Sequence, residues 1–347
     1  MKILVTGGAG FIGANYVRMV LAEHPEDEMA NLDVLTYAGN LENLAGLETH
    51  PRYRFVRGDI ADRALVTTLL DEGVDAVVNF AAESHVDRSI DDPDAFLHTN
   101  VAGTLALLDC ARRAGVKRFV QVSTDEVYGS LGPTGAFTEE SPLQPSSPYA
   151  ASKAAADLLA LSFRTTYGLP VMVTRCSNNF GPYQFPEKVI PLFVTNLLND
   201  QPVPLYGDGM NVRDWIHVAD HCAAVDLVLR RGEPGEVYNI GARSEQTNRA
   251  LTEMILAELG KPASLVRHVT DRLGHDRRYA MDPAKIERAL GWIPRHEFAA
   301  ALRATVAWYR DNRAWWEHIK SGAYTDYYER MYGERLRHSA GSHGKRA

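Results

Sequence analysis

The first half of the chain alternates short apolar runs with longer amphipathic segments. The first run, Lys2–Thr6, is followed at once by glycines and then by apolar residues at helical spacing. Short apolar runs bounded by polar or glycine-rich segments predict buried strands. Further strands are predicted at 29–35, 53–56, 76–80, 119–123 and 171–174. Strands that alternate with helices predict a parallel sheet with helices on both faces.

The alternation becomes less regular after about residue 176. Scattered strands at 203–205 and 237–240 and helices at 248–259 and 298–312 are predicted there. We therefore expect an α/β fold with a Rossmann-type, doubly wound parallel sheet. Residues 1–176 would form the cofactor-binding domain and carry the catalytic residues, and 177–333 a smaller α/β substrate-binding region. Residues 334–347 are polar and basic without periodicity, which predicts a disordered tail.

Composition narrows the class of protein. The 347 residues suggest about two domains, and a net charge of −7 argues against nucleic acid as a partner. Cys110, Cys176 and Cys222 are widely spaced, which favours buried thiols in a reducing compartment. No histidine spacing typical of a metal site is present, so no metal is predicted. No leader-like N-terminus or run of ~20 apolar residues is found, which predicts a cytoplasmic protein without a membrane partner.

The glycines after the first predicted strand indicate a dinucleotide site. Gly7, Gly10 and Gly13 stand between this strand and the first helix, where a tight turn and helix amides bind a pyrophosphate. A glycine triplet alone can be a plain turn, but Asp33 follows Gly13 by twenty residues at the end of the next strand. Asp33 should accept hydrogen bonds from ribose hydroxyls and repel a 2′-phosphate, which predicts NAD rather than NADP. Asp59 either contacts adenine or caps the following helix.

A tyrosine and a lysine one helical turn apart are candidate catalytic groups. The segment 146–149 (Ser-Ser-Pro-Tyr) predicts a helix start, which places Tyr149 and Lys153 on one face. The lysine cation lowers the pKa of a tyrosine, making phenolate available as a base, and can also hold the nicotinamide ribose. Such a pair is common by chance and gains meaning only behind a dinucleotide motif.

Two adjacent carboxyls follow the predicted strand 119–123. Thr124 should lie at the carboxyl end of this strand, where open α/β sheets bind ligands, and Asp125 and Glu126 come next. They are either polar loop residues or a catalytic pair. Neighbouring carboxyls tend to divide into one acid and one base. A nicotinamide enzyme that also moves protons on carbon and oxygen would use such a pair for elimination after oxidation.

Longer strings resemble a known family. The strings at 6–13, 35–40, 81–89, 177–179 and 274–279, with Thr124-Asp125-Glu126 and the Tyr149/Lys153 pair, resemble the dTDP-glucose 4,6-dehydratase family of the extended short-chain dehydrogenase/reductase superfamily. The resemblance runs from residue 1 to about 333. Val34 and Leu273 are unusual for the family but lie outside the catalytic positions. Sugar-nucleotide epimerases of the superfamily usually lack the acidic pair.

The resemblance implies an NAD-dependent hydro-lyase of deoxysugar nucleotide biosynthesis. It would convert dTDP-glucose to dTDP-4-dehydro-6-deoxyglucose and water. Tyr149 would take the proton of the 4-hydroxyl during hydride transfer from C4. Glu126 would then remove the C5 proton while Asp125 protonates the departing C6 hydroxyl, and hydride would return to C6.

The resemblance also implies contacts residue by residue. The cofactor would be bound by Gly7, Gly10, Phe11, Ile12, Gly13, Asp33, Thr36, Asp59, Ile60, Ala81, Thr99, Tyr149, Lys153 and Asn178. The substrate would be bound by Ser84, His85, Thr124, Asp125, Glu126, Asn178, Lys188, Arg213, Asn248, Arg272 and His275. Arg213 and Arg272 would clamp the diphosphate, although Arg213 could instead pair with Asp214, and Asn248 could be a helix cap. A homodimer formed through helices 95–114 and 149–167 is implied as well.

Two other classes of function remain. One is a different nucleotide-sugar dehydratase or a 4-epimerase of the same fold, since specificity for the base comes only from the resemblance. The other is a non-catalytic NAD-sensing protein, which would be expected to lose Tyr149 or Lys153.

Overall fold

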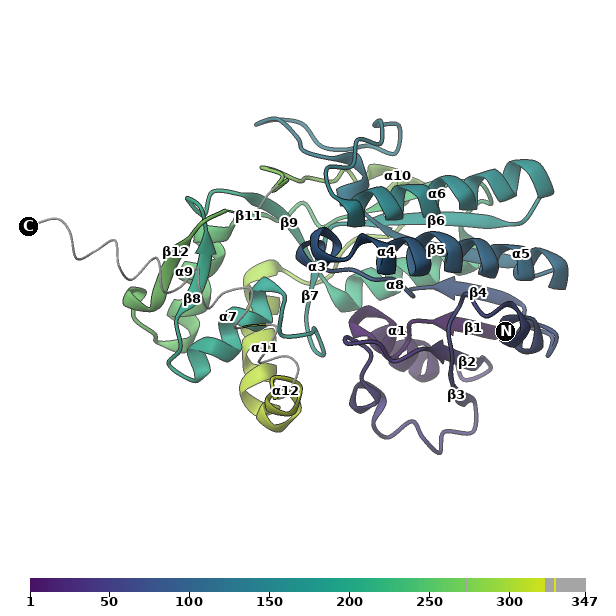
Figure 1. Ribbon diagram of the computed structural model, residues 1–347, viewed down its shortest axis with the longest axis horizontal. Coiled ribbons are helices and arrows are strands. Elements are labelled where there is room, and N and C mark those ends of the chain that lie inside the picture. The colour runs from purple at the N-terminus through teal and green to yellow at the C-terminus, as the bar shows by residue number, and fades with distance from the viewer. Residues whose placement is uncertain (272–273, 322–327, 329–347) are drawn as a thin grey trace, which may run out of the picture.

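A seven-stranded parallel sheet organises the computed structural model, which describes residues 1–271, 274–321 and 328 (Figure 1). The strand order is β10-β6-β5-β4-β1-β2-β3, and every neighbouring pair is parallel. The strands are β1 (Lys2–Thr6), β2 (Glu28–Asp33), β3 (Tyr53–Arg57), β4 (Ala76–Asn79), β5 (Arg118–Thr124), β6 (Val171–Cys176) and β10 (Val237–Ile240). The predicted doubly wound α/β fold is confirmed.

Helices bury both faces of this sheet. One face is covered by α2 (Arg63–Leu70), α5 (Thr104–Ala114) and α6 (Pro148–Tyr167), and the other by α1 (Phe11–Glu23), α8 (Val218–Arg231) and α10 (Ala284–Leu290). Between β4 and α5 the chain forms α3 (Val86–Asp91), α4 (Pro93–Phe96) and a π-helical segment, η2 (Leu97–Gly103). Helices α5 and α6 end at Gly115 and Gly168 in the left-handed conformation that glycine adopts without strain.

A second group of elements packs beyond the carboxyl ends of the strands (Figure 1). It contains a three-stranded sheet, ordered β11-β9-β7, and a β12-β8 pair. Its strands are β7 (Asn178–Phe180), β8 (Val203–Tyr206), β9 (Val212–His217), β11 (Glu245–Thr247) and β12 (Val266–Val269). Its helices α7 (Val189–Leu198), α9 (Asn248–Leu259), α11 (Phe298–Asp311) and α12 (Arg313–Ile319) share a separate apolar core.

The two groups of elements are not consecutive in the chain. After residue 176 the chain builds part of the second group and then returns to the large sheet with α8 and β10. The division into domains at residue 176 stays a prediction. The predicted tail, 334–347, lies outside the described residues.

One predicted strand ends earlier in the structure than the sequence indicates. The strand predicted at 29–35 ends at Asp33, because the Asp33 carboxylate accepts the amide of Leu35 at 2.8 Å and Leu35 has a φ of 60°. The three cysteines are buried free thiols, as predicted. Among the residues the structure describes, none of the helices has the length and apolar character needed to cross a membrane.

Candidate active site

The glycine loop after β1 has no room for a side chain at Gly7 or Gly13. Gly7 has a φ of 69°, and a Cβ there would lie 2.6 Å from the Ala81 amide nitrogen. A Cβ at Gly13 would lie 2.3 Å from the Gly7 carbonyl oxygen. At Gly10, the residue before α1, a Cβ would meet only the Gly7 carbonyl, at 3.3 Å, and otherwise open space. The loop thus lets a ligand approach the backbone at the N-terminus of α1, which suits a pyrophosphate.

Asp33 lies at the end of β2, at the edge of the cavity. Its two carboxylate oxygens accept the amides of Ala9 and Leu35 at 2.9 and 2.8 Å, which fixes the side chain. Burial raises its pKa, while these two hydrogen bonds lower it. Each oxygen keeps a lone pair that could accept a ribose hydroxyl.

Asp59 is not a helix cap. The N-cap of α2 is Asp62, whose carboxylate accepts the amides of Ala64 and Leu65. Asp59 instead accepts the Ala61 amide at 2.8 Å and contacts the His98 ring at 3.0 Å, on the wall of the cavity. The adenine contact stays a prediction.

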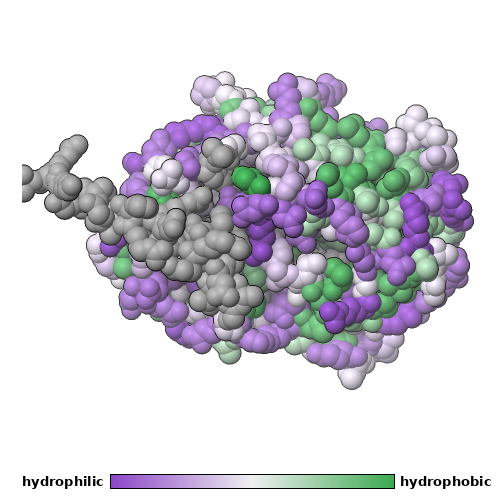
Figure 2. Space-filling view, viewed as in Figure 1, coloured by the Kyte–Doolittle hydropathy of each residue, from purple (hydrophilic) through white to green (hydrophobic). Residues whose placement is uncertain are grey.

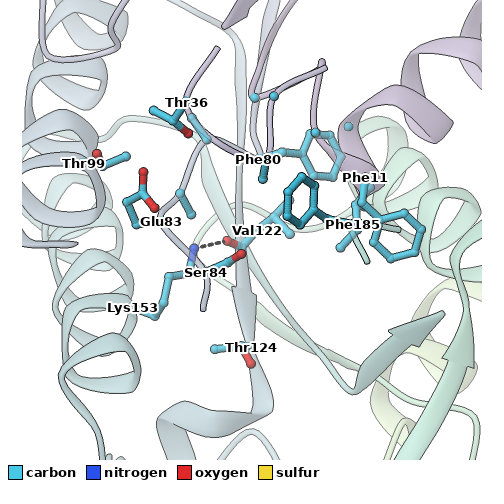
Figure 3. Close-up of a pocket in the computed structure, with 18 of the residues that line it drawn as sticks. Phe11, Thr36, Phe80, Glu83, Ser84, Thr99, Val122, Thr124, Lys153 and Phe185 are labelled. Carbon is cyan, nitrogen blue, oxygen red and sulfur yellow. Dashed lines mark hydrogen bonds between the residues drawn. The ribbon is translucent and has the colours of Figure 1, made fainter. Parts of the chain in front are cut away.

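A deep cavity runs from the glycine loop to the end of β5. All residues predicted to bind the cofactor line it. Thr36, Glu83 and Thr99 lie on one side and Phe11 and Phe185 on the other (Figure 3). Several lining residues were not predicted, although Glu83 belongs to the string 81–89: Phe80, Glu83, Cys176, Phe185 and Glu187.

Tyr149 and Lys153 face this cavity from α6. The helix begins as predicted, because the Ser147 hydroxyl accepts the Ala150 amide at 3.1 Å and Pro148 is the first residue. The Lys153 ammonium donates to the Val122 carbonyl at 2.7 Å (Figure 3). Burial raises the pKa of Tyr149 well above its usual value, and the charge of Glu126 adds to this. A phenolate at Tyr149 therefore requires a nearby positive charge, which Lys153 can supply.

The acidic pair opens a short 3₁₀ turn, η3 (Asp125–Tyr128), at the end of β5. Thr124 caps the turn: its hydroxyl accepts the Glu126 amide at 3.3 Å and donates to Asp125 at 3.2 Å. Asp125 is only 2% exposed, so it is no solvated loop residue. Burial, and then the charge of Glu126, raise its pKa well above the usual range. The raised pKa of Asp125 favours its protonated form, and the neighbouring Glu126 is only half-buried in the wall of the cavity.

A second cavity adjoins the first at shared residues. Glu126, Asn178, Glu187 and Lys188 line both cavities. Lys188 also donates to the Ser84 carbonyl at 2.9 Å. Further predicted substrate residues line only the second cavity: His85, Arg213, Asn248 and His275. Tyr206 and Trp215 line it too and were missed, because only the fold brings strands β8 and β9 here.

The structure decides two alternatives in the second cavity. Arg213 donates to the carbonyls of Val212 and Asp276, whereas Asp214 accepts the Ser244 amide, so no Arg213–Asp214 pair forms. The cap of α9 is Thr247, so Asn248 is its first helical residue rather than its cap. Arg272 lies outside the described residues.

Comparisons with known proteins identify the family of the chain. The model of the GDP-mannose 4,6 dehydratase family matches residues 4–305. A dTDP-glucose 4,6-dehydratase from Streptomyces antibioticus is 57% identical over 92% of this chain and 96% of its own. A solved dTDP-glucose 4,6-dehydratase from Streptomyces venezuelae, with NAD and dTDP bound, is 58% identical with a TM-score of 0.90, over 92% of this chain and 100% of its own. A UDP-glucose 4-epimerase from Thermotoga maritima is 30% identical with a TM-score of 0.84, over 90% of this chain and 100% of its own.

Proposed function

The chain belongs to the GDP-mannose 4,6 dehydratase family, and from this premise we propose that it converts dTDP-glucose to dTDP-4-dehydro-6-deoxyglucose and water. It would act as an NAD-dependent hydro-lyase in deoxysugar nucleotide biosynthesis. Fold alone does not select this reaction, because an epimerase also superposes well. The observation that carries the proposal is the buried Asp125 beside Glu126, in one cavity with Tyr149.

The residues around the first cavity fit NAD. Gly7, Gly10 and Gly13 would hold the pyrophosphate, Asp33 the adenosine ribose, and Lys153 the nicotinamide ribose. When bound, this cofactor would take up a hydride from sugar C4 and return it at C6.

The first proton transfer falls to Tyr149. Its phenolate would accept the proton of the glucose 4-hydroxyl as C4 is oxidised, and Thr124 would hydrogen-bond the same oxygen. Lys153, one turn along α6, would stabilise the phenolate by its charge. Since burial raises the pKa of Tyr149, this charge is needed at neutral pH.

Elimination falls to the acidic pair. The C4 ketone acidifies the C5 proton, which the Glu126 carboxylate would remove. Asp125, whose pKa is raised by burial, would give its proton to the C6 hydroxyl as it leaves as water. A proton returned to C5 and a hydride returned to C6 complete the product.

The second cavity would hold the nucleotide. Arg213 is positioned by the Asp276 carbonyl at 3.0 Å and by the Tyr279 ring, 4.3 Å from its guanidinium carbon. The planar Arg213 guanidinium is thus held in the wall of the second cavity, and its shape would suit diphosphate oxygens, with Arg272 as the proposed second member of the clamp. The remaining proposed contacts are those of Ser84, His85, Asn178, Lys188, Asn248 and His275.

Incubation with dTDP-glucose tests the function. The expected product shows the alkali-induced absorbance of a 4-keto sugar, with no net consumption of NAD. Tyr149→Phe is the matched inactive control, because it removes only the hydroxyl. Release of dTDP-galactose would favour a 4-epimerase, and equal turnover of UDP-glucose would remove the specificity for thymidine. A protein that binds NAD but turns over neither sugar would support the NAD-sensing alternative.

We also propose a homodimer formed through η2, α5 and α6. Apolar residues gather on this face of the molecule (Figure 2), and Leu97 and Leu158 are 52% and 58% exposed there. Leu158→Glu should yield a monomer by light scattering. Ile293→Glu, at an equally exposed residue (64%) on the connection between α10 and α11, should leave the dimer intact. A wild-type protein that is already monomeric would refute the proposal.

The proposed compartment is the cytoplasm. The three cysteines are buried thiols, which a reducing compartment preserves. Cell fractionation tests this placement, and recovery of the enzyme outside the cytoplasm would contradict it.

A further inference from the structure

A fully buried ion pair lies behind the catalytic lysine. Asp157 follows Lys153 by one turn on α6, and its Oδ2 accepts the Arg175 Nε at 2.9 Å. The side chains of Asp157 and Arg175 are 0% and 4% exposed. Burying two charges carries a large desolvation cost, so such a pair is weak evidence for a stabilising role. Its placement beside Lys153 indicates a different role.

The same arginine reaches the turn that carries the acidic pair. Arg175 Nη1 donates to the Tyr128 hydroxyl at 2.9 Å, and its guanidinium carbon lies 4.9 Å from the Tyr128 ring centroid. The Tyr128 hydroxyl in turn donates to Asn239 Oδ1 at 2.8 Å. Tyr128 is the last residue of η3, which begins at Asp125. A continuous network therefore joins the helix of Lys153 to the turn of Asp125 and Glu126.

Resting on the proposed function, we propose that Asp157, Arg175 and Tyr128 are positioning residues. They would hold the groups for oxidation at a fixed position relative to the groups for elimination. Tyr149 and Lys153 act at C4, whereas Glu126 and Asp125 act at C5 and C6 of the same bound sugar. These groups come from separate elements, and small misplacements of catalytic groups cost large factors in rate. The network fixes α6 against η3 through β6, whose Arg175 is the register partner of Ser123 in β5.

Asp157 also affects the pKa of Lys153 through its negative charge. Burial lowers the pKa of Lys153, and the charge of Asp157 is the first of the two influences that raise it again, before Cys176. Burial raises the pKa of Asp157, and the positive charges of Arg175 and Lys153 oppose this rise and so favour its carboxylate. Replacing Asp157 by Asn would leave two cations buried near each other and disfavour the lysine charge that Tyr149 requires.

The two ends of the network should give opposite kinetic signatures. Asp157→Asn acts through Lys153, so it should slow the appearance of NADH after mixing with dTDP-glucose by about tenfold or more. Tyr128→Phe removes one hydroxyl behind the acidic pair, so it should slow the decay of NADH by a similar factor. NADH should accumulate in Tyr128→Phe and not in Asp157→Asn. Stopped-flow absorbance in a single turnover measures both phases.

A partly buried ion-pair cluster elsewhere provides the control. Arg230 on α8, whose side chain is 22% exposed, donates to Asp226 at 2.7 Å and to the buried Asp27 at 2.6 Å, and none of the three lines either cavity. Arg230→Met should lower the melting temperature, as the network variants do, while keeping the wild-type ratio of NADH appearance to decay.

The outcomes separate the inference from the proposed function. If the wild type forms no 4-keto sugar, the proposed function fails. If it does, and both network variants melt earlier but keep the wild-type ratio, the network is only structural and the inference is overturned. If Tyr128→Phe does not fold, Asn239→Ala replaces it, because it removes the acceptor of the Tyr128 hydroxyl and should also slow NADH decay.

Discussion

Asp125 and Glu126 are adjacent in sequence but have different surroundings. Asp125 points into the protein, where its Oδ1 meets the Thr124 hydroxyl, and burial raises its pKa. Glu126 borders both cavities. Two neighbouring carboxyls in unlike environments can serve as acid and base at one pH. If the two residues divide the work in this way, replacing Glu126 should block removal of the C5 proton, and replacing Asp125 should block loss of the C6 hydroxyl.

Glu126→Gln should stop the reaction after oxidation. The amide keeps the size of the side chain but cannot accept the C5 proton, so NAD should still be reduced on mixing with dTDP-glucose. Product formation should fall by ~10²–10⁴-fold, as is typical for loss of a general base. Stopped-flow absorbance of NADH, paired with deuterium incorporation at C5 from solvent, measures the two steps.

The matched variant is Asp125→Asn, which should slow loss of the C6 hydroxyl more than hydride transfer. Exchange of C5 deuterium at the wild-type rate in Glu126→Gln would assign the base to another residue.

Asp33→Ala should weaken the preference for NAD. The carboxylate would bind the ribose diol and repel a 2′-phosphate, and its removal also frees the amides of Ala9 and Leu35. Affinity for NAD should fall while affinity for NADP changes less, so the ratio of the two affinities should move closer to one. Titration calorimetry with both cofactors measures it. Equal affinities in the wild type would contradict the role of Asp33.

At the level of elements, the sequence predicted the helix and strand boundaries that depend on neighbouring residues. Strand β1 and helix α9 have the predicted bounds, and α6 begins at the predicted serine–proline cap. The predicted strand 29–35 ran too far, because the hydrogen bond from Leu35 to Asp33 turns the chain after residue 33. The three-stranded sheet of β7, β9 and β11 was not predicted, since its short strands pair across distant segments.

Ser147→Ala should destabilise the start of α6. The variant leaves the Ala150 amide without its side-chain acceptor, which typically costs about 1 kcal/mol. Since Tyr149 lies two residues on, hydride transfer should slow as well. Asp62→Ala, at the cap of α2, is the control: it should lower stability similarly and leave hydride transfer unchanged. Chemical denaturation and NADH kinetics measure the two effects, and identical kinetics in both variants would contradict the coupling.

At the level of the whole molecule, the site depends on both groups of elements. Motifs near the ends of β1 and β5 predicted candidate cofactor-binding and catalytic residues that line the first cavity, because each motif is a continuous stretch of chain. Residues such as Arg213 and His275 were found only through family resemblance, and Tyr206 and Trp215 not at all. Their proximity depends on long-range packing, which no local pattern in the sequence encodes.

The whole molecule also carries a buried titratable group that the reaction does not use. His221 on α8 is fully buried, and neither ring nitrogen has a hydrogen-bond partner within the described part of the chain. Burial lowers its pKa to about 3, from an ordinary value of about 6.5. The folded state therefore excludes a proton that the unfolded state binds below about pH 6.5. The stability that neutral His221 provides is present above that pH and is lost as the pH falls towards 3.

His221→Leu should remove this dependence. Carboxyls whose pKa is raised by folding, such as Asp214 with a pKa of about 6, stabilise the folded state as the pH falls, which is opposite to the effect of His221. The pH dependence of wild-type stability alone is therefore no test. In the difference between variant and wild type these other groups cancel, and any change in packing adds only a constant offset. Below about pH 6, the free energy of unfolding of the variant should rise relative to that of the wild type by about 1.4 kcal/mol for each unit that the pH falls. Urea unfolding at several pH values between about 5 and 7.5 measures the difference. A difference that stays constant over this range would mean that His221 takes up its proton over the same pH range in the folded and the unfolded protein, against its complete burial.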